Sequence, residues 1–292
     1  MIFKKNNLAE LKSHFRINLP AFSNRELDLI LKELSFKRLG INSTDFLLSD
    51  EVFLSDSDFK FYLDVLKRLQ KSEPFQYIIG EVLFYNVILK SDNRALIPRP
   101  ETEELVDWVL KSVNQFNCKL VLDLCAGSGC IAFAIKNALP DTKVFAIENS
   151  SKSVDLISEN IEFSNINIDV LESDIFNPNS FSCFNENSFD VWISNPPYIP
   201  KNEQENINKN VLDFEPHSAL FVNDDNPIIF YEEIALNAKK YLKDKGYIFF
   251  EIHQDFKHNI LRLLSSLGFV NIDLRKDMQG RYRMIRAQNV IL

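Results

Sequence analysis

The sequence is poor in glycine, cysteine and histidine, and it contains no long apolar run. Its 292 residues include seven glycines, four cysteines and four histidines. No apolar stretch approaches the ~20 residues that a membrane-spanning helix needs. The N-terminus, MIFKKNNLAELKSHF, has two adjacent lysines and then turns amphipathic, without the apolar core of a signal peptide. We therefore expect no membrane partner and a cytoplasmic location.

The spacing of the cysteines argues against a metal cluster or a disulfide framework. They form no C-x-x-C pair, and no histidine lies close to them in the sequence; the four are Cys118, Cys125, Cys130 and Cys183. Reduced thiols in a cytoplasm are the expected state of such residues. We predict no metal site.

The net charge of −8 is unevenly distributed. Residues 1–75 carry 12 basic and 11 acidic side chains, a net charge of +1, so the rest of the chain carries −9. An acidic main portion argues against tight binding to duplex DNA, which relies on the neutralisation of many phosphates. We expect no stable nucleic-acid partner, although a local basic groove would still permit one.

A helical pattern in the first 72 residues gives way to a β-like one. Apolar residues recur at helical spacing in residues 8–15, 27–34 and 58–70, and Ser23 is the expected cap of the second helix. From Tyr77 to Ile97 the pattern is β-like with a polar SDNR break, which predicts a hairpin connector. We expect a helical domain (1–73), a hairpin linker (74–98) and a larger domain (99–292).

Predicted strands and helices alternate in the larger domain. Helices are expected over 102–114, through Asn137 and after Ser150, and buried strands over 119–124, 142–148, 168–173, 189–195 and 247–252. Segments 270–276 and 281–287 predict a closing antiparallel pair. The alternation is typical of an α/β fold with a parallel sheet covered on both faces. Ligands then bind at the carboxyl ends of the strands.

The first such strand end reads D-L-C-A-G-S-G, from Asp123 to Gly129. Two of the seven glycines, Gly127 and Gly129, lie within three residues, which indicates a loop that needs positive φ or close approach of its backbone to a ligand. The following helix adds free N–H groups. The fingerprint G-x-G-x-x-G and the Lys-Ser/Thr pair of a P-loop are both absent. A purely structural turn remains the alternative.

Acidic residues follow the next two strands. Glu148 ends the second strand, nineteen residues after Gly129, where a carboxylate can accept both hydroxyls of a ribose. The alternative is a helix-capping or solvated acid, because Asn149 and Ser150 follow and could cap the next helix. The third strand ends at Ser173-Asp174-Ile175, where a carboxylate and an apolar neighbour could flank an adenine ring.

The fourth strand ends in Asn195-Pro196-Pro197-Tyr198, the most specific motif of the chain. The Asn195 side chain offers a neutral carbonyl oxygen. Pro196 is restricted to an extended conformation by Pro197, so its carbonyl can be a second fixed acceptor. Tyr198 supplies a flat face. Such a site fits an amino group on a planar, conjugated carbon, whose lone pair two acceptors steer toward an incoming methyl group.

Together these segments resemble the bacterial peptide chain release factor N(5)-glutamine methyltransferase family. The resemblance spans residues 74–287 and is carried by FQYIIGEVLFYN, by LIPRPETE (96–103), by 123–129, by 195–198 and by FEPHSAL (214–220). It implies a seven-stranded, Rossmann-like class I methyltransferase domain preceded by a helical substrate-recognition domain and a β-hairpin linker. It also implies methyl transfer from S-adenosylmethionine to the side-chain amide of the Gly-Gly-Gln glutamine of class I release factors.

The resemblance assigns roles to particular residues. Cofactor contacts are implied for Cys125, Ala126, Gly127, Ser128, Gly129, Glu148, Ile175 and Asn195. The substrate glutamine would be held by Asn195, Pro196, Pro197 and Tyr198, with Asn195, Pro196 and Tyr198 catalytic. The family usually has glycine at Cys125, more often aspartate at Glu148, and often an aromatic residue at Ile175.

Three other functions remain open at this point. Asn-Pro-Pro-Tyr also suits an adenine amino-group methyltransferase of DNA or RNA. A glutamine methyltransferase of a large-subunit ribosomal protein would have much the same catalytic domain. A nucleotide-binding module could retain the glycine loop without turnover.

Overall fold

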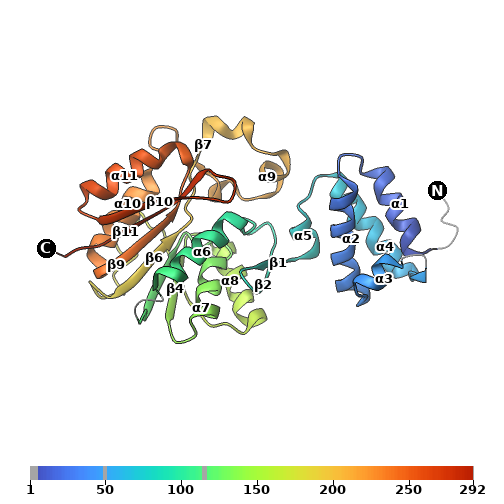
Figure 1. Cartoon of the computed structure of the whole chain (residues 1–292), viewed down its shortest axis with the longest axis horizontal. Helices are drawn as coiled ribbons and strands as arrows, with labels where there is room; N and C mark the ends of the chain where they lie inside the picture. The colour runs from blue at the N-terminus through green and yellow to red at the C-terminus, as the bar shows by residue number, and fades with distance from the viewer. Residues whose placement is uncertain (1–5, 49–50, 114–116, 292) are drawn as a thin grey trace. The chain divides into compact units, whose positions relative to one another are not determined.

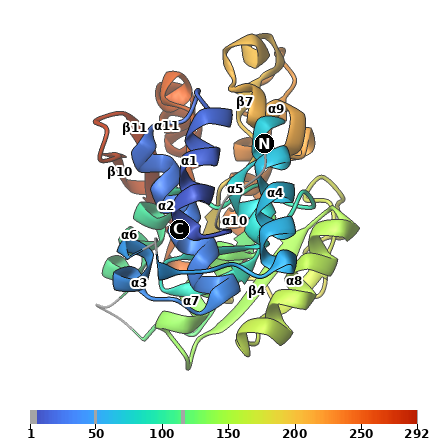
Figure 2. The same cartoon turned by 90° about the vertical axis from the view of Figure 1, so that its right-hand side faces the viewer.

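The computed structural model describes residues 6–48, 51–113 and 117–291 and divides the chain into two compact units, Met1–Gly80 and Glu81–Leu292 (Figure 1). The first unit is helical, with α1 (Leu8–Asn18), α2 (Asn24–Leu39), α3 (Ser43–Leu47), α4 (Asp56–Gln70) and α5 (Phe75–Ile79). Within it, α1 packs against both α2 and α4 (Figure 2). None of the helices in the described part of the chain combines the length and apolarity required to cross a bilayer.

The three predicted N-terminal helices are confirmed, and their apolar stripes form the core of the first unit. Ser23 caps α2 as expected, in a capping box with Glu26. The β-like interpretation from Tyr77 is wrong at its start, because residues 75–79 form the short helix α5. Pro74 precedes that helix, and Gly80 ends it in the left-handed conformation, with φ +75°.

The hairpin itself packs into the second unit. Strands β1 (Glu81–Phe84) and β2 (Val87–Lys90) pair as an antiparallel hairpin. Phe84, Val87 and Leu89 are buried in the core of that unit. The backbone N–H of Lys90 donates to Asn160 Oδ1 at 2.6 Å, which fixes the hairpin on the helix that carries Asn160. The segment expected to link two domains is thus held by one of them.

The second unit is built on a seven-stranded sheet, as expected. Its strands are β3 (Leu120–Leu124), β4 (Lys143–Glu148), β5 (Asp169–Glu172), β6 (Phe189–Ser194), β9 (Leu242–Glu251), β10 (Val270–Lys276) and β11 (Tyr282–Gln288). They follow the order β10-β11-β9-β6-β3-β4-β5. The last five in this order are parallel, and β10 and β11 form the predicted closing antiparallel pair. This is the sheet of a class I methyltransferase fold.

Helices cover both faces of the sheet (Figure 1). One core contains side chains of α6 (Pro100–Val113), α7 (Cys130–Ala138) and α8 (Ser151–Ser164). The opposite core contains side chains of α10 (Ile229–Tyr241) and α11 (Lys257–Ser266), two helices that the sequence pattern did not single out. Asn114, the predicted last residue of α6, lies outside the described residues.

Short elements occupy the segments that follow β6 and β9. These are β7 (Ile199–Pro200), η2 (Lys201–Asn206), α9 (Lys209–Phe214), η3 (His217–Ala219), β8 (Phe221–Val222) and η4 (Gln254–Phe256). Strands β7 and β8 pair in parallel, so the residues just after the fourth sheet strand are tied to the segment that follows FEPHSAL. That tie brings residues 216–219 to the same place as Asn195.

Candidate active site

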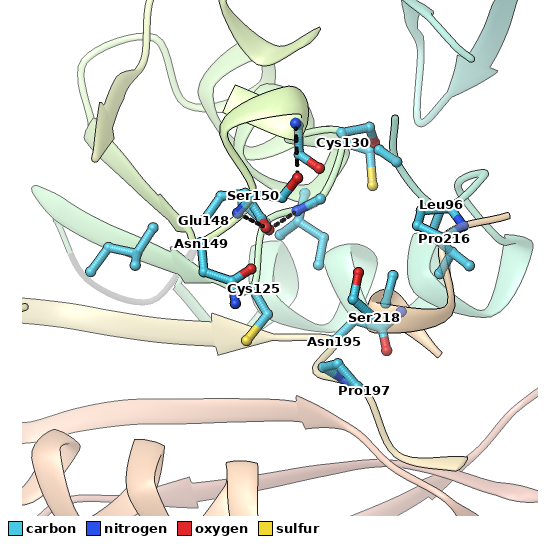
Figure 3. A pocket seen from close by; sticks show the side chains of 18 of the residues that line it. Leu96, Cys125, Cys130, Glu148, Asn149, Ser150, Asn195, Pro197, Pro216 and Ser218 are labelled. Carbon is cyan, nitrogen blue, oxygen red and sulfur yellow. Dashed lines mark hydrogen bonds between the residues drawn. The ribbon is translucent and has the colours of Figure 1, made fainter. Parts of the chain in front are cut away.

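A pocket of about 920 Å³, counting its open mouth, lies at the carboxyl ends of the parallel strands (Figure 3). Its walls come from the residues that follow β3, β4, β5 and β6, from residues 95–102 and from residues 216–219. The predicted residues that line it are Cys125, Ala126, Gly127, Ser128, Glu148, Ile175, Asn195 and Pro197. Gly129, Pro196 and Tyr198 lie outside this lining.

The glycine loop adopts the backbone that its composition indicates. Gly127 and Gly129 have φ of +56° and +78°. A Cβ on Gly129 would lie 3.0 Å from the Phe133 ring and 3.2 Å from the Ile157 side chain, so Gly129 also permits close packing beneath the loop. Cys125 has φ +58°, a conformation that is costly for a residue with a Cβ. A glycine at this position would carry no such cost.

Glu148 is almost fully buried and its carboxylate is held by two backbone donors. Gly127 N–H donates to Oε2 at 2.8 Å, and Ser150 N–H donates to Oε1 at 2.9 Å (Figure 3). Each oxygen keeps a second lone pair, and the side chain lines the pocket. Helix α8 is capped instead by the Ser150 hydroxyl, which accepts from Ser153 N–H. The capping alternative for Glu148 therefore does not apply.

One wall of the pocket is apolar. Ile175 is buried there, and Ile131, Ile147 and Phe230 also line the pocket. Phe230 lies in α10, and its ring packs edge to face on the ring of Phe176, with 5.1 Å between the ring centroids. Phe230 thus adds an aromatic side chain to the pocket wall that contains Ile175.

Asn195 and Tyr198 are both held by one hydrogen-bonded network. Asn195 Nδ2 donates to Thr102 Oγ1 at 3.2 Å, and the Thr102 hydroxyl donates to Glu251 Oε2 at 2.6 Å. The Tyr198 hydroxyl donates to Glu251 Oε1 at 3.1 Å. Tyr198 therefore turns its hydroxyl toward the end of β9 rather than into the pocket.

Glu251 is the buried centre of this network. Burial raises the pKa of its carboxyl, and the hydrogen bond from Thr102 and the positive charge of Arg283 oppose that rise. The sequence interpretation missed Thr102 and Glu251. The available signals were a threonine inside LIPRPETE and an acid at the end of an otherwise apolar strand.

A second buried carboxylate joins two motif segments at the pocket. Glu215 of FEPHSAL accepts from the backbone N–H of Ile97 at 3.1 Å and from the Arg99 guanidinium at 2.5 Å. Residues on both sides of this contact, among them Pro98 and Pro216, line the pocket. The pair thus fixes the pocket wall that LIPRPETE and FEPHSAL share.

The donor set fits S-adenosylmethionine. The fixed Glu148 carboxylate suits a pair of vicinal hydroxyls, and the apolar wall suits a flat heterocycle. The Ser128 hydroxyl is buried and lines the pocket, so it can bond a polar group of the ligand.

Comparisons with known proteins agree with this geometry. The sequence matches the Methyltransferase small domain family over residues 105–217 and the PrmC N-terminal domain family over residues 23–80. Among solved structures, a methyltransferase from Pyrococcus furiosus is 17% identical, with a TM-score of 0.53 over 78% of this chain and 99% of that chain. This likeness shows the fold.

Curated relatives are similar over nearly the whole chain. A release factor glutamine methyltransferase of Flavobacterium psychrophilum is 34% identical over 95% of this chain and 92% of its own length. One of Streptococcus pneumoniae is 39% identical over 95% of this chain and 97% of its own length. The chain therefore belongs to the release factor glutamine methyltransferase family.

Proposed function

We propose that this protein transfers a methyl group from S-adenosylmethionine to the side-chain amide nitrogen of the glutamine in the Gly-Gly-Gln motif of class I release factors. The observation that carries this proposal is the position of Asn195 and Pro197. Both line the pocket that Glu148 and the glycine loop also line. A planar amide can thus be held beside a site suited to the methyl donor.

The cofactor is held, in this proposal, by Cys125–Gly129, Glu148, Ile175 and Asn195. Glu148 accepts the two ribose hydroxyls, and Ile175 with Phe230 packs on the adenine. When bound, S-adenosylmethionine supplies a methyl group made electrophilic by its positively charged sulfur. The burial that raises the pKa of the Cys125 thiol keeps it protonated, so it does not compete for the methyl group.

The acceptor amide is held by Asn195–Tyr198. Asn195 Oδ1 and the Pro196 carbonyl accept the two N–H groups of the glutamine amide, and the Tyr198 ring packs on its plane. These acceptors stabilise the positive charge that develops on a nitrogen whose lone pair is delocalised. They also orient that nitrogen within reach of the pocket. No strong base is required before transfer, because the nitrogen becomes acidic once it is alkylated.

The rest of the proposal concerns the partner and the location. Residues 1–73 recognise the release factor, in keeping with the match of residues 23–80 to a domain of the same family. The protein works in the cytoplasm, where its four free cysteines remain reduced.

The test is to incubate the protein with isotope-labelled S-adenosylmethionine and a class I release factor, and to map the label by mass spectrometry. Label on the Gly-Gly-Gln glutamine, and none on a Gly-Gly-Ala factor, is the expected result. Parallel reactions contain a large-subunit ribosomal protein, duplex DNA and RNA. Label confined to one of those acceptors would replace the proposed substrate, and no label on any acceptor would leave only a binding module.

A further inference from the structure

Three segments that are distant in sequence converge on the Glu251 carboxylate. Thr102 lies in the first turn of α6, Tyr198 follows β6, and Glu251 is the last residue of β9. Thr102 and Glu251 are nearly fully buried, with exposed fractions of 2% each. A buried polar network of this kind stabilises one arrangement only if each member is correctly paired.

The carboxylate sets the direction of every hydrogen bond in the network. The positive charge of Arg283 favours the ionised form of Glu251, and an ionised carboxylate accepts hydrogen bonds and donates none. The hydroxyls of Thr102 and Tyr198 therefore direct their protons to Glu251. With its single proton used, the Thr102 oxygen can only accept, so the group of Asn195 that faces it must be the amino group.

This direction decides which end of the Asn195 amide serves the substrate. With Nδ2 bound to Thr102, Oδ1 is the end left to accept from an acceptor amide. If the Asn195 amide were reversed, its N–H groups would face the N–H groups of the substrate glutamine, and the two sets of donors would repel each other. We propose that Glu251 and Thr102 are positioning residues that fix the orientation of Asn195, and that Glu251 also anchors the Tyr198 ring. This inference rests on the proposed function, because it assumes an amide acceptor at Asn195.

The test compares Thr102→Val with Thr102→Ser and with a matched control. Valine keeps the shape of threonine but removes its hydroxyl, so Asn195 loses its fixed orientation and kcat falls about 10²-fold. Serine restores the hydroxyl and returns kcat to near the wild-type value. The control is Thr142→Val, since Thr142 is also buried, 3% exposed, and donates to Cys118 O at 2.9 Å outside the pocket. It should lower Tm and leave kcat unchanged.

A second variant, Glu251→Gln, tests the same network from the carboxylate side. Glutamine has one accepting oxygen and one donating amino group, so it cannot accept from both hydroxyls. When the amino group faces Thr102, the Thr102 proton is redirected to Asn195 and the Asn195 amide reverses. We expect kcat to fall at least as far as in Thr102→Val. The double variant should be no slower than Glu251→Gln alone, because both changes break one network.

The readouts separate positioning from general damage. Calorimetry should show that the affinity for S-adenosylmethionine falls far less than kcat in both variants, since Asn195 is one of several cofactor contacts, and the KM for the release factor should stay near the wild-type value. The inference is overturned if Thr102→Val retains wild-type kcat, or if Thr102→Ser is as slow as Thr102→Val. It is also overturned if the fold-decrease in kcat of the double variant equals the product of the decreases in the two single variants. If Thr102→Val does not fold, the Glu251→Gln and Thr102→Ser comparisons decide. Failure of the wild-type protein to label any release factor overturns the proposed function instead.

Discussion

The site has two halves that are built by different means. The loop half consists of Cys125–Gly129, Glu148 and Ile175, and its geometry comes from backbone conformation and backbone N–H donors. The acceptor half consists of Asn195–Tyr198 with Thr102 and Glu251, and hydrogen bonds between side chains join these three segments. The first half can be held by a short stretch of chain, whereas the second exists only when three separate elements meet.

The difference appears in the sequence separations. Glu148 is bound by residues two and 21 positions away. Thr102 and Glu251 are 149 positions apart, and Asn195 and Thr102 are 93 apart. Variants of the acceptor half should therefore change turnover, and variants of the loop half should change cofactor affinity or backbone stability.

The largest effect is expected from Asn195→Ala. Loss of the Oδ1 acceptor should lower kcat by about 10³-fold, because that acceptor stabilises charge that develops only during methyl transfer. The affinity for S-adenosylmethionine should change far less, as measured by calorimetry. Asn160→Ala is the matched control, since the side chain of buried Asn160 bonds the backbone of Lys90 on the hairpin and its loss should affect Tm rather than kcat. If Asn195→Ala lost cofactor binding to the same extent as turnover, the loop half and the acceptor half would not have separate roles.

Glu148→Gln should act mainly on binding. The neutral amide cannot accept from both backbone donors and the ribose hydroxyls, so the Kd for S-adenosylmethionine should rise about 10- to 100-fold. The KM for the release factor should remain unchanged in steady-state assays at saturating cofactor. Glu172→Gln is the control, because exposed Glu172 lies beside Glu148 on β5. An unaltered Kd in Glu148→Gln would mean that this carboxylate holds the loop but does not bind the ribose hydroxyls.

The sequence predicted the loop half well because its signals are local. The two glycines, the acid after the second strand and the alternation of elements each report on a few neighbouring residues. The local signals at Thr102 and Glu251 do not reveal that the two residues pair, since their pairing depends on how α6 and β9 pack. The same limit explains the helix at 75–79, where Pro74 and Gly80 outweigh the β-like run of apolar residues.

Replacement of Cys125 should show how much the left-handed backbone conformation of the loop half lowers the free energy of unfolding. Its φ of +58° is unfavourable for any residue with a Cβ. Cys125→Gly should therefore be about 1 kcal/mol more stable than Cys125→Ala in urea unfolding, the reverse of the usual preference for alanine. Equal stabilities, or a more stable alanine variant, would mean that the left-handed conformation stores no strain.

The smallest effect is expected at the rim of the loop half. The hydrogen bond from Arg94 lowers the pKa of Glu159 to about 2, and this contact ties α8 to the segment that leads into the pocket wall. An acid whose pKa is lower in the native state stabilises that state when the pH is above the acid's ordinary pKa. This stabilisation is lost as the pH falls toward 2. Glu159→Gln should lower Tm by about 2 °C near neutral pH, because the pair is only partly buried. The difference from wild type should vanish in acid; a constant difference at all pH values would exclude the ion pair as its cause.

The place of Glu251 in the chain sets an order of assembly. Strand β9 pairs with β6 on one side and with β11 on the other, so it joins the sheet only after most of the polypeptide has been made. Ribosomes release the N-terminal segments first, and contacts between distant residues form late. The glycine loop and Glu148 can thus take shape on a nascent chain that still lacks any anchor for Asn195. Methylation competence arrives last, as a property of the finished polypeptide.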